Sequence, residues 1–148
     1  MTGPQVGPKH IDRSRSRAWA LQILYRWETS EHGADLRQAL VDVQGTRRIG
    51  PQRLEYICRI LDGLGENLVG LDEEITASLD NWRLNRLSII DRGILRIAAL
   101  EMLHFDDVPP KVSIQEAVRL AERWGGNDSP RFVNGVLDAL LHKADVRG

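Results

Sequence analysis

The chain has 148 residues, of which 42% are hydrophobic and 28% are charged. This composition excludes a collagen-like, low-complexity or wholly disordered chain. The net charge of −1 conceals an uneven distribution, because residues 1–20 hold four basic residues against one acidic residue, a net +3. The sequence has no apolar run long enough to span a bilayer and no signal-like segment, so we expect a cytoplasmic protein.

The first part of the chain changes character near residue 11. Residues 1–10 are rich in proline and glycine, so we predict a flexible leader before a single helical domain at 11–148. From Asp12 onward, apolar side chains follow helical spacing on two faces, which indicates a helix that packs on more than one side. A second short helix is predicted around residues 36–43.

A long apolar pattern follows Pro51, a residue well suited to the first position of a helix. Three glycines, Gly63, Gly65 and Gly70, interrupt this pattern. Because glycine weakens a helix interior, we expect a break or kink there, with a separate segment continuing to Leu79.

Two helices are predicted between residues 88 and 124. Ser88 has the character of an N-cap, and Pro109 and Pro110 are expected to end the helix that it starts. Ser113 and Glu116 then fit the S-x-x-E pattern of a capping box, in which each side chain satisfies a free backbone amide. This pattern predicts that the next helix begins at Ser113.

A last helix is predicted after the stop signal of Gly125 and Gly126, with its start at Ser129 and Pro130. Gly135 lies inside this helix, and close packing against a neighbouring helix is the favoured explanation for it. No sustained alternating pattern typical of strands is present, so the sequence predicts an all-α fold without a sheet.

The sequence offers no catalytic centre. No P-loop and no nucleophile elbow is present, and Cys58 is the only cysteine, which excludes an internal disulfide and a cysteine-based zinc site. The histidines fall in separate segments without metal-ligand spacing. We therefore predict no catalytic residue, no metal site and no cofactor. The four histidines are His10, His32, His104 and His142.

The arginines Arg13, Arg15 and Arg17 form the one cluster whose location suggests a function. A basic helix start can neutralise several phosphates of a nucleic-acid strand. Arginine planes also recognise unstacked bases, so single-stranded RNA is the favoured ligand. On the residues alone, a merely solvated arginine cluster is an equal alternative.

Both ends of the chain resemble a known family. Residues 13–27 read RSRSRAWALQILYRW, and the second half contains LRIAALEM, DVPPKVSIQEAVRLAERWG and SPRFVNGVLD. These segments resemble the NusB family of transcription antitermination factors, and FVNGVLD at residues 132–138 is the most specific of them.

The resemblance implies a compact all-helical fold of two small helical subdomains, without catalysis. Family members bind boxA-type single-stranded RNA of nascent ribosomal transcripts together with NusE, a small-subunit ribosomal protein. They help to assemble an antitermination complex on RNA polymerase, and some self-associate into homodimers. A helical protein-interaction or homodimerisation module without specific RNA binding is the alternative.

The resemblance also implies roles for individual residues. Family positions on the RNA side correspond here to Arg13, Arg15, Arg17, Asp128 and Phe132. Family positions on the NusE side correspond to Tyr25 and Asp91.

Overall fold

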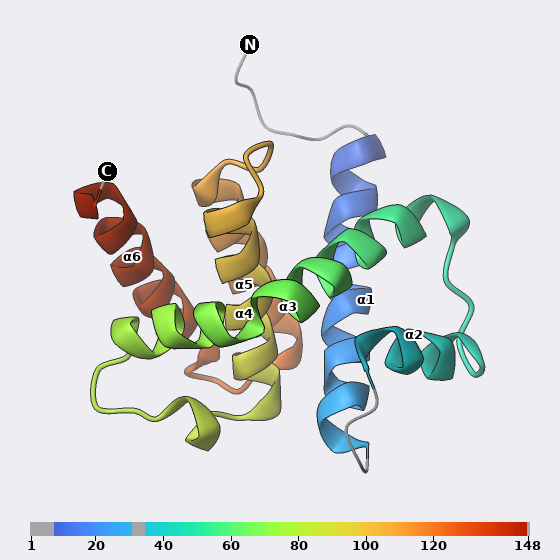
Figure 1. Ribbon diagram of the computed structural model, residues 1–148, viewed down its shortest axis with the longest axis horizontal. Coiled ribbons are helices and arrows are strands. Elements are labelled where there is room, and N and C mark those ends of the chain that lie inside the picture. The colour runs from blue at the N-terminus through green and yellow to red at the C-terminus, as the bar shows by residue number, and fades with distance from the viewer. Residues whose placement is uncertain (1–7, 31–34, 148) are drawn as a thin grey trace. The chain divides into compact units, whose positions relative to one another are not determined.

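The computed structural model describes residues 8–30 and 35–147, and these residues form six α-helices, one 3-10 turn and no strand (Figure 1). The all-α prediction is therefore confirmed over the described residues. In chain order the elements are α1 (Pro8–Thr29), α2 (Leu36–Gln44), α3 (Pro51–Ser78), η1 (Leu84–Arg86), α4 (Ile89–His104), α5 (Pro110–Trp124) and α6 (Ser129–Arg147).

The chain divides into two compact units, residues 1–62 and residues 63–148. The boundary falls inside α3, so the first part of this helix belongs to one unit and the second part to the other. This division agrees with the two helical subdomains that the family resemblance implies.

The first unit is built on the contact between α1 and α2. Its core comes from α1, α2 and the first part of α3, all of which contribute fully or almost fully buried aliphatic side chains. Asp35 caps α2, since its carboxylate accepts a hydrogen bond from the Gln38 backbone N–H at 2.7 Å. On the surface of the same unit, Arg37 of α2 donates two hydrogen bonds to Asp62 of α3, at 2.9 and 2.8 Å.

Helix α1 begins at Pro8, three residues before the predicted start of the helical domain at residue 11. Residues 8–10 are therefore helical. The remainder of the predicted leader, residues 1–7, lies outside the described residues.

The second unit packs α4, α5 and α6 against one another (Figure 1). Helix α4 is its centre, and every residue from Gly93 to Glu101 is buried. Ser88 caps α4 as predicted, because its hydroxyl accepts a hydrogen bond from the Asp91 backbone N–H at 3.0 Å. Arg96 of α4 donates two hydrogen bonds of 2.9 Å to Asp72 of α3.

The expected break in α3 is wrong, because the helix runs without interruption through all three glycines. Close packing against α4 explains why glycine occupies position 63. A Cβ atom at this position would lie 2.9 Å from Cδ1 of Leu100, which is fully buried in α4. Gly65 and Gly70 have open space around them, so tertiary packing elsewhere along α3 outweighs their weak helix propensity.

The predicted boundaries of α4 and α5 also need correction. Helix α4 ends at His104, well before the two prolines, and Pro110 is the first residue of α5. Proline suits this first position because it has no N–H to leave unsatisfied. Ser113 and Glu116 are consequently buried within α5 and form no capping box.

The predicted boundary between α5 and α6 is confirmed. Gly125 follows the last residue of α5, and the hydroxyl of Ser129 accepts a hydrogen bond from the Gly126 N–H at 2.9 Å at the start of α6. The close-packing explanation for Gly135 is wrong, however. This residue is exposed, and a Cβ atom there would meet no atom within 4 Å.

Candidate nucleic-acid interface

Three arginines of the first unit converge on the ring of Tyr56. The guanidinium carbons of Arg13, Arg17 and Arg59 lie 4.6, 5.6 and 5.7 Å from the ring centre. Tyr56 itself is buried in α3. Because an aromatic face attracts a guanidinium, the ring holds positive charge from α1 and α3 in one place. We call these four residues the Tyr56 cluster.

The three predicted arginines of α1 differ in exposure. Arg15 is exposed and Arg13 is half-buried, whereas Arg17 is only 2% exposed. Arg13 and Arg15 are therefore the members of the predicted set that present their charge to solvent. Arg17 is buried and packs against the ring of Tyr56.

A groove of about 330 Å³ lies beside the Tyr56 cluster, between α1 and the first part of α3. Three cationic side chains line it, and the two acidic residues that join them are Asp12 and Glu55. Asp12 also pairs with Arg53 at 3.5 Å, which offsets its negative charge. The lining residues are Lys9, Asp12, Arg13, Ser16, Gln52, Glu55, Tyr56 and Arg59.

Sequence reasoning missed Lys9, Tyr56 and Arg59. Tyr56 and Arg59 are three residues apart, a spacing that places them on one face of a helix. That spacing alone does not indicate that this face meets the arginines of α1. The meeting is a tertiary contact between segments about forty residues apart in the sequence.

The other predicted RNA-side residues lie in the second unit, in a depression of about 350 Å³. The depression brings together Asp91, Asp128 and Phe132, although the resemblance assigns Asp91 to a protein partner and the other two to RNA. Its lining residues are Trp82, Arg86, Leu87, Ser88, Asp91, Gly126, Asn127, Asp128, Ser129 and Phe132. We call this depression the aromatic pocket.

Two features distinguish the aromatic pocket. The half-buried ring of Phe132 lies edge to face with the ring of Trp82, at 6.1 Å between centres and an angle of 69°. In addition, Oδ1 of Asp91 is buried and has no hydrogen-bond partner among the described residues. Buried carboxylate oxygens usually have partners, so this atom makes Asp91 a candidate contact residue.

Tyr25, the other residue predicted on the protein-partner side, is on α1 in the first unit. Its side chain is 47% exposed, and its backbone carbonyl accepts a hydrogen bond from the Thr29 hydroxyl at 2.8 Å. Tyr25 lines neither the groove nor the aromatic pocket.

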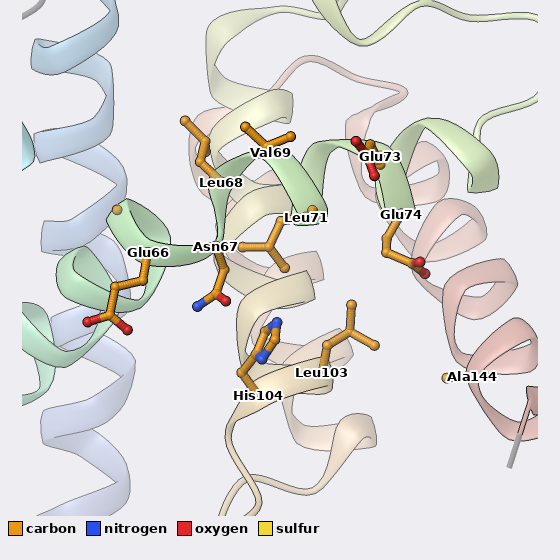
Figure 2. Close-up of a pocket in the computed structure, with 12 residues that line it drawn as sticks. Glu66, Asn67, Leu68, Val69, Leu71, Glu73, Glu74, Leu103, His104 and Ala144 are labelled. Carbon is orange, nitrogen blue, oxygen red and sulfur yellow. The ribbon is translucent and has the colours of Figure 1, made fainter.

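A third depression, of about 620 Å³, runs along the second part of α3 and contains none of the predicted site residues. Figure 2 shows Leu71 of α3 and Leu103 and His104 of α4 pointing toward one another, while Leu68 and Val69 point to the other side of α3. Within residues 8–30 and 35–147 no three His, Cys, Asp or Glu side chains are grouped to hold a metal ion. Over the same ranges, every helix is too short or too polar to cross a membrane.

The NusB family model matches residues 14–142 of the chain. The transcription antitermination protein NusB of Chloroherpeton thalassium is 37% identical over 139 residues, which is 93% of this chain and 65% of that protein. The chain thus spans just under two thirds of that relative's length. This all-helical chain with an arginine-rich first helix belongs to the NusB family. The members of this family are transcription antitermination proteins and not enzymes.

Solved structures share the fold. NusB of T. maritima is 33% identical and superposes with a TM-score of 0.77, covering 97% of this chain and 94% of its own. A structure of antitermination factors NusB and NusE in complex with dsRNA has a TM-score of 0.77 over 93% of this chain and 99% of its own, at 22% identity. At that identity the second likeness shows the fold alone.

Proposed function

We propose that this protein is a non-enzymatic RNA-binding antitermination factor that binds boxA-type RNA of nascent ribosomal transcripts together with NusE. The observation that carries the proposal is the Tyr56 cluster with its cationic groove, which occurs at the arginine-rich start of a NusB-family chain. The protein acts in the cytoplasm, requires no cofactor, and helps to load the antitermination complex onto RNA polymerase.

The first unit binds the RNA backbone. Arg13 and Arg59 reach the groove from two helices, and the exposed Arg15 adds charge on α1. Arginine suits this task because its planar guanidinium donates two parallel hydrogen bonds to a phosphate. Tyr56 restrains Arg13 and Arg59 before RNA arrives, so less conformational entropy is lost on binding.

The second unit joins RNA binding to partner binding. Phe132 and Asp128 contact RNA, and Asp91 contacts NusE, with Tyr25 of the first unit as a further NusE contact. The shared aromatic pocket supports this arrangement, since a protein held at Asp91 would border an RNA strand held at Phe132. RNA binding through a few arginines is weak, and a partner that touches the same RNA raises the affinity through a joint surface.

The test is a fluorescence-anisotropy titration of labelled boxA-type RNA and a scrambled RNA, with and without purified NusE. We expect tighter binding of the boxA-type RNA, and a further gain when NusE is present. If the protein binds neither RNA in either condition, and instead forms a homodimer or another protein complex, the RNA-binding function is wrong.

A further inference from the structure

Trp82 is a large aromatic side chain that the fold leaves in solvent. Its exposed fraction is 58%, higher than the 39% of Trp124, the other exposed tryptophan of the second unit. Its neighbour Asn81 adopts a positive φ of 63°, a conformation that asparagine tolerates better than most residues. More than half of the Trp82 side chain stays in contact with water, so most of its apolar surface is open to a ligand.

The ring of Trp82 is supported from one side. Phe132 meets it edge to face at 6.1 Å, which limits the motion of both rings, while more than half of Trp82 remains accessible. A supported and accessible aromatic surface is what an unstacked nucleobase requires, because every base has a π-face that can stack on it.

The polar groups of the aromatic pocket fit the remainder of a nucleotide. Arg86 can take a neighbouring phosphate, and the carboxylate of Asp128 can accept hydrogen bonds from the N–H groups of a base edge. A nucleotide is complementary to the two rings, the Asp128 carboxylate and the Arg86 guanidinium together.

We infer that Trp82 and Phe132 form a stacking platform for one unpaired base of the bound RNA, with Arg86 at the adjoining phosphate. The inference rests on the proposed RNA-binding function and adds two residues to it, Trp82 and Arg86. Neither belongs to the set that the family resemblance points to.

The test compares the wild-type protein with Trp82→Ala and Trp82→Phe, using boxA-type RNAs in which each base in turn is replaced by an abasic residue. Trp82→Ala should weaken binding of the intact RNA by roughly 5- to 150-fold, the range for removal of one base–aromatic stack. Trp82→Phe should retain part of the affinity. At one position of the RNA, the loss of affinity caused by Trp82→Ala and the loss caused by the abasic residue should not add. Both changes remove the same stacking interaction.

Trp124→Ala is the matched control, and its affinity for the intact RNA should equal that of the wild type. Circular dichroism of each variant checks that the helices remain. If the wild type binds RNA but Trp82→Ala binds it equally well, the platform is wrong and the proposed function stands. Effects that add at every abasic position, or a Trp82→Ala defect in NusE binding alone, also overturn the platform. If the wild type binds no RNA, both proposals fail.

Discussion

The guanidinium carbon of Arg13 lies 4.6 Å from the ring centre of Tyr56, an interaction that links the arginine-rich start of α1 to α3. Arg59, which is on α3 together with Tyr56, lies 5.7 Å from the centre of the same ring. The tyrosine thus converts a basic sequence segment into a fixed arrangement of charge. Because the guanidiniums are already ordered, the arrangement favours phosphate binding over a merely solvated arginine cluster.

The close approach of Gly63 to Leu100 predicts a difference between two glycine substitutions in α3. Both Gly63→Ala and Gly65→Ala gain helix propensity, but only a methyl group at Gly63 would press on buried Leu100. We expect Gly63→Ala to have a free energy of unfolding about 1–3 kcal/mol lower than Gly65→Ala, measured by urea denaturation. Equal stabilities would show that Leu100 moves aside without cost.

The ion pair of Arg96 and Asp72 predicts a second stability effect. The guanidinium of Arg96 is almost fully buried, with 9% of its side chain exposed, and it donates two hydrogen bonds to the carboxylate. Asp72→Asn leaves this charge poorly compensated, so we expect the free energy of unfolding to fall by about 1–3 kcal/mol. Asp62→Asn, which breaks an exposed pair, should lower it by less than about 1 kcal/mol. Similar decreases in the two variants would contradict this assignment.

The exposed pair of Arg37 and Asp62 predicts a pH dependence. The hydrogen bond from Arg37 lowers the pKa of the Asp62 carboxyl, and the same bond raises the pKa of Arg37. Because the pKa of Asp62 is lower in the folded state, its ionised carboxylate stabilises the fold at pH values above its unfolded-state pKa of about 4. This stabilisation is lost as the pH falls through the pKa of Asp62 in the folded state.

The measurement for this pair is the stability difference between wild type and Arg37→Gln. We expect a difference below about 1 kcal/mol at pH 7, because both groups are exposed, and none near pH 2. A stability difference that increased as the pH fell would have the opposite pH dependence to the one expected, and would contradict the assigned ion pair.

The aromatic pocket predicts that one substitution separates RNA binding from NusE binding. Asp91→Lys removes the carboxylate assigned to NusE and adds a positive charge beside Phe132. NusE affinity should fall, whereas RNA affinity without NusE should be unchanged or slightly higher. Asp106→Lys, an exposed change in the same unit, is the charge-matched control. Parallel decreases in RNA and NusE affinity would refute the separate roles.

Local signals in the sequence predicted most helix starts correctly. Ser88, Ser129 and Pro51 are each at or beside the helix start that they indicate. The errors arose where tertiary packing, and not the local sequence, determines where a helix begins or continues. Nothing in the neighbourhood of Gly63 indicates the close approach of Leu100, and the S-x-x-E pattern at Ser113 is outweighed by a proline that starts the helix earlier.

The candidate site was only partly predictable for the same reason. Arg13, Arg15 and Arg17 stand out in the sequence as a basic cluster, but the burial of Arg17 depends on its tertiary packing against Tyr56. The contribution of Tyr56 depends on α3 meeting α1. Trp82 has no helical pattern around it, so its pairing with Phe132, fifty residues away, is visible only in the fold.

The most direct test of the central claim is the salt dependence of RNA binding by the wild type and by the double variant Arg13→Gln/Arg15→Gln, with Arg131→Gln as an exposed control. The slope of log K against log salt concentration should become shallower by about 0.7 for each phosphate that is no longer neutralised, about 1.4 in the double variant. The control should keep the wild-type slope. A double variant with unchanged slope and affinity would contradict an RNA-binding role for the arginine-rich start of α1.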